Sequence, residues 1–182
     1  MAKTGSSPFL QKGAGSPDFN LPGIGDRTYS LKDFGGKGGF LVLFICNHCP
    51  YVKARMADIV DLDKEFGDKI AIVGINSNDP DYPGEGMENM KTFAKERGIK
   101  FPYLLDEDGA VAKAYRATCT PDPFLFDKNL KLVFHGRITD ALEPSDTTHE
   151  YTMRDNIHKL FKGGKIEPWF NPSLGCSIKF KG

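Results

Sequence analysis

The most constraining feature of the sequence is a pair of cysteines at CxxC spacing, Cys46 and Cys49, between an apolar run and a helical pattern. The run over residues 40–45 is continuously apolar, which is typical of a buried central strand. After the motif, Pro50 fits the first turn of a helix, and apolar residues then recur at three- and four-residue intervals as far as Phe66. The two thiols are therefore predicted to lie at a strand-to-helix junction.

This junction favours thiol chemistry at both cysteines. Unpaired backbone N–H groups and the positive end of the helix dipole stabilise a thiolate relative to a thiol. Cys46 is the predicted nucleophile, and Cys49 is the predicted resolving thiol that attacks a mixed disulfide held at Cys46. His48 directly precedes Cys49 and is predicted to tune the Cys46 thiolate, through a hydrogen bond or a positive charge.

The composition excludes several classes of function. Its 24 basic and 24 acidic residues cancel, and no long Lys/Arg run appears, which argues against binding to nucleic acid or to an anionic membrane. No stretch is apolar enough to cross a bilayer, and residues 1–16 lack the apolar core of a secretory signal. We therefore expect a cytoplasmic protein, where a CxxC is more often catalytic or metal-binding than a structural disulfide.

The pattern along the chain predicts one α/β domain. A chain of 182 residues, of which 40% are hydrophobic, is long enough for one well-packed core and short for two. Residues 1–16 are predicted to be a flexible tail, residues 17–165 the domain, which opens with a β-hairpin, and residues 166–182 a C-terminal extension that carries Cys176. The expected strands span residues 40–45, 70–75, 124–126 and 130–134, and the expected helices span residues 50–66, 87–98, 111–115 and 148–162.

A second signature is the proline of Thr120-Pro121, which opens a strand-like segment and resembles the cis-proline loop of the thioredoxin superfamily. More closely, residues 44–52, 74–79 and 175–179 resemble the peroxiredoxin-like group of thioredoxin-fold proteins, which is related to redoxins, alkyl hydroperoxide reductases and thiol-specific antioxidants. The resemblance implies a thioredoxin-like fold, with a central mixed β-sheet flanked by helices. It also implies that Thr120 and Pro121 present an extended substrate peptide to the cysteines.

The chain departs from true peroxiredoxins at the residues that activate a peroxidatic thiol. Those enzymes carry a Pro-x-x-x-Thr-x-x-Cys signature, but Leu43 stands at the threonine position relative to Cys46, and Cys46 stands there relative to Cys49. Pro121 appears where the activating arginine is expected. Without a hydroxyl and a guanidinium to polarise the O–O bond, attack on peroxide loses electrostatic assistance. The sequence therefore favours disulfide exchange over peroxide reduction.

Two roles remain open in the sequence. The strand over residues 39–45 contains no carboxylate that would deprotonate Cys49, so Asp122 and His48 are the candidate proton acceptors. Cys176 is a possible additional redox thiol, and the alternative is a packed or exposed cysteine without a redox role.

Cys119 is expected to be a small core residue, since strand alternation turns it away from the side that Thr120 faces. A four-thiolate zinc site is the alternative, although its second half lacks CxxC spacing. That site would use Cys46, Cys49, Cys119 and Cys176.

The sequence predicts a thiol-disulfide oxidoreductase that exchanges electrons through Cys46 and Cys49. This chemistry needs no cofactor and no metal. The expected electron donor is a dithiol protein or glutathione, and the expected substrate is a disulfide-bearing protein or a small thiol compound. Two alternatives stay open: a thiol-dependent peroxidase that uses the same cysteines, and a non-catalytic redox-sensing or zinc-binding module.

Overall fold

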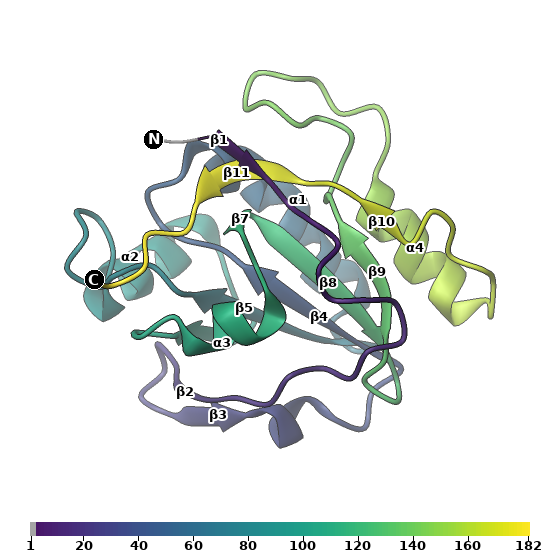
Figure 1. Cartoon of the computed structure of the whole chain (residues 1–182), viewed down its shortest axis with the longest axis horizontal. Helices are drawn as coiled ribbons and strands as arrows, with labels where there is room; N and C mark the ends of the chain where they lie inside the picture. The colour runs from purple at the N-terminus through teal and green to yellow at the C-terminus, as the bar shows by residue number, and fades with distance from the viewer. Residues whose placement is uncertain (1–2) are drawn as a thin grey trace.

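A mixed sheet with strand order β10-β9-β8-β4-β5-β6 lies at the centre of the computed structural model, which describes residues 3–182 (Figure 1). Strands β4, β5 and β6 run parallel to one another, and β8 pairs antiparallel with both β4 and β9. The expected α/β fold with a central mixed sheet is confirmed. The strands span β4 Gly39–Phe44, β5 Ala71–Asn76, β6 Tyr103–Leu105, β8 Asp122–Asp127, β9 Leu132–Gly136 and β10 Phe170–Asn171.

The central strand β4 is buried on both faces, as its continuous apolar run predicts. Leu41 and Leu43 belong to one hydrophobic cluster, which α1, α2 and α4 cover. Phe40, Val42 and Phe44 belong to a second cluster on the opposite face, which α3 covers. Side chains alternate faces along a strand, so a strand covered on both sides is apolar at every position. The helices span α1 Pro50–Phe66, α2 Met87–Arg97, α3 Ala110–Tyr115 and α4 Thr152–Phe161.

Helix α1 has the predicted bounds. Pro50 is its first residue, and at its end the Gly67 amide donates a 2.8 Å hydrogen bond to Asp63 O. Full burial of one large apolar side chain contributes about 1.5–3 kcal/mol, so the apolar face fixes this helix, and the cysteine turn before it, against the sheet. That face consists of Val52, Met56, Ile59, Leu62 and Phe66.

The N-terminal hairpin is confirmed, while the last helix starts later than expected. Strands β2, Asn20–Pro22, and β3, Thr28–Ser30, pair antiparallel. Helix α4 begins at Thr152 rather than near residue 148, because the amides of His149 and Glu150 donate to the Asp140 carboxylate, at 2.8 and 2.9 Å. These side-chain bonds hold the preceding residues in a loop. No helix within residues 3–182 is long and apolar enough to span a membrane.

The two ends of the chain meet in a small antiparallel sheet with strand order β1-β11-β7 (Figure 1). Residues 3–16 are expected to be a flexible tail, but the first of them form strand β1. Further along, the amides of Gly13 and Ser16 donate hydrogen bonds to Leu132 O and Leu130 O, next to β9. Composition alone does not reveal that β11 has a free edge with which this segment can pair. Residues 1–2 of the expected tail lie outside the described residues. Residues 166–182 add β10 to the central sheet and β11 to the small one. The strands of the small sheet span β1 Lys3–Gly5, β7 Cys119–Thr120 and β11 Leu174–Ser177.

Candidate active site

Cys46 and Cys49 lie between the end of β4 and the start of α1, as the sequence predicts. Cys49 is the N-cap residue of α1, and Pro50 follows as its first residue. Both cysteines are 0% exposed, and both are free thiols. The turn is therefore a reduced dithiol enclosed by protein.

Thr120 contacts both thiols from the loop that faces them. The Thr120-Pro121 peptide bond is cis, which confirms the predicted cis-proline loop. Thr120 Oγ1 lies 3.2 Å from Cys46 Sγ, and Thr120 O lies 3.3 Å from Cys49 Sγ. The two signatures that are distant in the sequence thus form one site.

Cys176 is a third thiol in this site. Its Sγ lies 3.0 Å from Cys49 Sγ, and the residue is 2% exposed. In the antiparallel ladder between β11 and β7, Cys176 is the partner of Thr120. The backbone of Thr120, which the resemblance assigns to substrate, is therefore paired with the chain's own C-terminal strand here.

Glu85 is a residue of the site that sequence reasoning missed. Its side chain is 0% exposed, and its carboxylate accepts hydrogen bonds from the amides of Asn47 and His48, both at 3.1 Å, and from Asn76 Nδ2 at 2.6 Å. It also pairs with His48 Nδ1. A single glutamate in a Pro/Gly-rich loop has no spacing that marks it, because its partners come from two other segments. Glu85 is the buried anion that holds the turn between the cysteines.

His48 is directed towards Glu85 rather than bonded to the Cys46 sulfur. Its ring lies 4.8 Å from the Tyr82 ring, centroid to centroid, and its Nε2 has no hydrogen-bond partner within residues 3–182. The predicted hydrogen bond from His48 to Cys46 is not formed, because the His48 imidazole is bonded to the buried carboxylate of Glu85. The hydroxyl of Thr120 contacts the Cys46 sulfur instead.

The surroundings stabilise negative charge on Cys49. A hydrogen bond from the Cys46 thiol lowers the pKa of Cys49 and outweighs the effect of burial; with further contacts from Cys176 and the Val52 amide, that pKa falls to about 5. Burial raises the pKa of Cys46 well above its ordinary value, and the bond to Cys49 and the Glu85 carboxylate act in the same direction. Burial and the contact with Cys49 raise the pKa of Cys176 to about 12. The sequence predicts a thiolate at Cys46; in the closed, reduced site the contacts of this pair lower the pKa of Cys49 and raise that of Cys46.

This arrangement makes a pH prediction for the reduced protein. Because the folded pKa of Cys49, about 5, lies below its ordinary value of 9.0, the unfolded chain binds more protons between these values. The stabilisation is therefore present above the ordinary value and is lost as the pH falls through the folded value. We expect the ultraviolet absorbance of the thiolate to titrate near pH 5 in the wild type and to lose this step in Cys49→Ser. A step near the ordinary value in the wild type would contradict the assignment.

Asp122, a candidate proton acceptor for Cys49, lies on the other face of the sheet. It pairs with Phe44 in the register of β8 and β4, and its Oδ1 lies 2.6 Å from His135 Nε2. The His135 ring stacks on Phe124, with centroids 3.9 Å apart, beside the second hydrophobic cluster. Because side chains alternate along β8, Asp122 shares the face of Phe124 and not that of the cysteines. Of the two candidate proton acceptors, Asp122 is therefore not positioned to take a proton from Cys49.

Cys119 stays apart from the other three thiols. It is 0% exposed, and its Sγ lies 3.6 Å from Pro121 O, as expected for a core residue. Within the part of the chain that the structure describes, the one group of three or more side chains of metal-binding type whose ligand atoms all lie within 4.8 Å of one another consists of Cys46, His48 and Glu85. The four cysteines therefore do not converge on one four-thiolate site.

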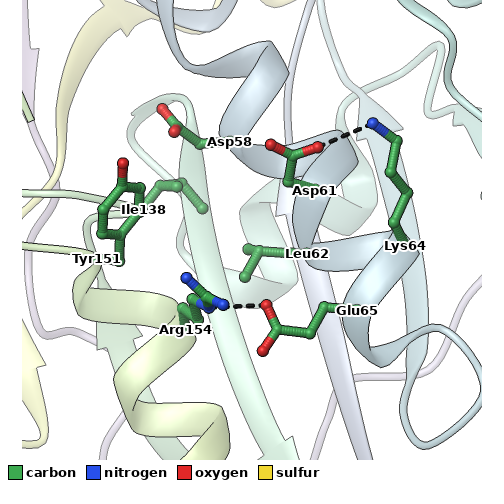
Figure 2. A pocket seen from close by; sticks show the side chains of 8 residues that line it. All are labelled: Asp58, Asp61, Leu62, Lys64, Glu65, Ile138, Tyr151 and Arg154. Carbon is green, nitrogen blue, oxygen red and sulfur yellow. Dashed lines mark hydrogen bonds and ion pairs between the residues drawn. The ribbon is translucent and has the colours of Figure 1, made fainter.

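A pocket of about 400 Å³ lies between α1 and α4, away from the thiols (Figure 2). One ion pair joins the two helices, with Arg154 Nε 2.7 Å from Glu65 Oε2, and a second lies within α1, with Lys64 Nζ 2.9 Å from Asp61 Oδ1. The pocket is lined by Asp58, Asp61, Leu62, Lys64, Glu65, Ile138, Tyr151 and Arg154. It contains no thiol and takes no part in the dithiol site.

Comparison with known proteins agrees with the geometry of the site. The model of the AhpC/TSA family matches residues 13–135, which is more than half of the chain. A relative from Geobacillus thermodenitrificans, named thiol-disulfide oxidoreductase ResA, is 30% identical over 131 residues, covering 70% of this chain and 71% of the relative.

Two solved structures show the same fold. A conserved protein from Geobacillus kaustophilus has a TM-score of 0.93 at 38% identity, with 100% of this chain and 97% of that chain covered. The thioredoxin domain of a thiol-disulfide oxidoreductase from Bacteroides vulgatus has a TM-score of 0.60 at 22% identity, covering 69% of this chain and 88% of that chain. With a CxxC turn against a cis-proline loop on this fold, the chain belongs to the AhpC/TSA family and is a thioredoxin-like thiol-disulfide oxidoreductase.

Proposed function

We propose that Cys46 and Cys49 form the redox centre through which this oxidoreductase exchanges electrons with disulfides. The observation that carries the proposal is the contact of both sulfurs with Thr120, from a cis-proline loop, at the head of α1. The contacts of Cys49 with the thiols of Cys46 and Cys176 also lower its pKa, which favours its ionisation.

In the reducing direction, Cys46 Sγ attacks a substrate disulfide, forms a mixed disulfide and releases one substrate thiolate. Cys49 Sγ then attacks Cys46 Sγ, the Cys46–Cys49 bond forms, and the second substrate thiol leaves with the electron pair. In the mixed disulfide Cys46 no longer has a proton to donate, so the contacts that remain to lower the pKa of Cys49 are those with Cys176 and the Val52 amide. In the opposite direction Cys49 is the leaving group, and a thiol of low pKa leaves faster.

The electron donor that we propose is a dithiol protein or glutathione, and the substrate is a disulfide-bearing protein or a small thiol compound. The relative named as a thiol-disulfide oxidoreductase supports a disulfide substrate. The cytoplasmic location expected from the sequence stays a prediction.

The environment of Cys46 argues against the alternative of a thiol peroxidase. Within residues 3–182, the hydrogen bonds of the Cys46 and Cys49 sulfurs involve Thr120 and Cys176, and none comes from an arginine or lysine. A positive group that would stabilise the charge developing on peroxide is missing from these contacts.

A paired assay tests the proposal. The wild type is expected to reduce the disulfides of a model protein with dithiothreitol as reductant, and to consume hydrogen peroxide far more slowly. Cys46→Ser is expected to lose the disulfide activity, whereas Cys119→Ser, which alters a thiol outside the site, is expected to keep it. Peroxide turnover faster than disulfide turnover in the wild type, or full disulfide activity in Cys46→Ser, would reject the proposed centre.

A further inference from the structure

Cys49 has two sulfur neighbours rather than one. It shares the CxxC turn with Cys46, whose thiol lowers its pKa, and it lies 3.0 Å from the Sγ atom of Cys176 on β11. Cys49 is thus the middle member of a row of three thiols. A CxxC pair needs only its own two sulfurs, so the position of Cys176 calls for a separate explanation.

Strand β11 is hydrogen-bonded to a neighbouring strand along each of its two edges, which fixes the position of Cys176. It pairs with β1 on one side and with β7 on the other, where Cys176 faces Thr120. Beyond the strand, the Lys179 amide donates to Asn78 Oδ1 at 2.7 Å, and Lys179 O accepts from the Asp79 amide at 2.6 Å. The third thiol is therefore positioned by backbone pairing and not by a mobile end.

Gly175 is what allows β11 to approach so closely. A Cβ atom at this position would lie 1.9 Å from Thr120 O and 3.2 Å from Pro121 N. Both contacts are with backbone, which cannot rotate away as a side chain could. Only glycine at position 175 permits the spacing that brings the Cys176 and Cys49 sulfurs together.

We propose that Cys176 is a third redox thiol that exchanges with Cys49, an inference that rests on the proposed Cys46–Cys49 centre. The step begins after a substrate has oxidised that pair. The Cys176 sulfur, on losing its proton, attacks Cys49 Sγ; the Cys49–Cys176 bond forms, and the Cys46–Cys49 bond breaks. Cys46 leaves with the electron pair and takes up a proton, so no electron is gained or lost overall.

This exchange replaces the disulfide within the CxxC turn by a disulfide between the turn and the C-terminal strand β11. Cys49 can hold only one partner at a time, so the Cys46–Cys49 and Cys49–Cys176 disulfides are alternatives. In the second state Cys46 is a free thiol again, and β11 is covalently tied to the head of α1. A reductant must open the Cys49–Cys176 bond before Cys49 can resolve another mixed disulfide at Cys46.

Disulfide mapping of the full-length protein tests the exchange. The reduced protein is oxidised with oxidised glutathione, quenched with acid, alkylated and cleaved with trypsin. Cys46 and Cys49 fall in the peptide 38–53, and Cys176 falls in the peptide 166–179, so a cross-link between these peptides reports the third thiol. The wild type is expected to show both the internal 38–53 disulfide and the cross-link.

Variants identify the partner of Cys176. The cross-link is expected to persist in Cys119→Ser and to vanish in Cys49→Ser and Cys176→Ser. In Cys46→Ser it is expected to form by a different first step: oxidised glutathione forms a mixed disulfide at Cys49, and the Cys176 sulfur then displaces the glutathione thiolate. In Gly175→Ala it is expected to form about 100-fold more slowly, since a displacement near 1 Å costs that much in a positioned reaction. Gly25→Ala is the matched control, because an added Cβ there meets nothing within 4 Å.

Two results would overturn the proposal that Cys176 is a redox thiol that exchanges with Cys49. One is the absence of the cross-link in both the wild type and Cys46→Ser while the internal 38–53 disulfide forms in the wild type. The other is a cross-link that survives in Cys49→Ser, since Cys46 would then be the partner. Turnover of a disulfide substrate, measured on the same preparations, separates the two proposals. If Cys46→Ser loses activity and no cross-link forms, only the role of Cys176 is rejected. If Cys46→Ser keeps its activity, the proposed Cys46–Cys49 centre is rejected.

Discussion

Cys49→Ser is expected to lower turnover of disulfide substrates by at least about 1,000-fold and, at the same time, to accumulate a mixed disulfide at Cys46. The substitution removes the sulfur that resolves the mixed disulfide. It also removes the hydrogen bond and the negative charge of Cys49, both of which raise the pKa of Cys46. Cys46 should therefore ionise more readily than in the wild type, so the first step proceeds and the second cannot.

Intact mass measurement after incubation with oxidised glutathione checks this result. We expect one glutathione adduct in Cys49→Ser, located at Cys46 by peptide mapping, and no stable adduct in the wild type. The double variant Cys46→Ser/Cys49→Ser is the control, and it should carry no adduct in the peptide 38–53. An adduct that appears only on Cys176 would assign the first attack to a different thiol.

Glu85→Ala is expected to lower the free energy of unfolding by about 3–5 kcal/mol, the cost of removing one partner from a buried charged network. The carboxylate is 0% exposed and accepts hydrogen bonds from Asn47, His48 and Asn76. Its loss leaves these donors buried without an acceptor, and each such group costs about 1–3 kcal/mol. Denaturant unfolding of the reduced protein measures the effect.

The same substitution has a chemical consequence that a purely structural role would not produce. The Glu85 carboxylate raises the pKa of Cys46, so removing its charge should lower that pKa. Glu85→Gln should lose less stability than Glu85→Ala, because the amide keeps the shape and one acceptor oxygen, but it should lower the Cys46 pKa in the same direction. The titration is best read in a Cys49→Ser background, where Cys46 is the remaining thiol of the turn.

A neighbouring surface glutamate provides the control. Glu88 lies on α2 with its side chain 85% exposed, and Glu88→Ala should change stability by no more than about 0.5 kcal/mol. Equal losses in Glu85→Ala and Glu88→Ala, or a Cys46 pKa that does not move in Glu85→Gln, would contradict the role assigned to the buried carboxylate.

Features with a local sequence pattern were predictable. The apolar run of β4, Pro50 and the apolar spacing of α1 placed the cysteine turn at a strand-to-helix junction, and the structure has α1 with the predicted bounds. The cis-proline loop was also predictable, because Thr120-Pro121 opens a strand. These features depend on the periodicity and conformational preference of consecutive residues, which a single sequence displays.

Errors arose where a side chain's direction or partner depends on a distant segment. Asp122 is one of two candidate proton acceptors for Cys49, but its place in β8 turns its side chain to His135 on the other face. The predicted hydrogen bond from His48 to the Cys46 sulfur is not formed, because Glu85 binds the His48 ring; the other predicted route, a positive charge on His48, stays a prediction. A glutamate in a loop has no pattern that distinguishes a buried anion from a solvated one.

By itself, the sequence determined the fold class, the CxxC turn at the head of a helix and the redox nature of the chemistry, because these follow from local spacing and residue type. Only the tertiary structure decided which contacts shift the pKa of each sulfur and which thiol lies next to Cys49. The Cys49 pKa depends on contacts with Cys46, Cys176 and the Val52 amide, and its place beside Cys176 depends on the pairing of β11 with β7. Such contacts join residues that are far apart in the chain, and they exist only once the backbone has brought those residues together.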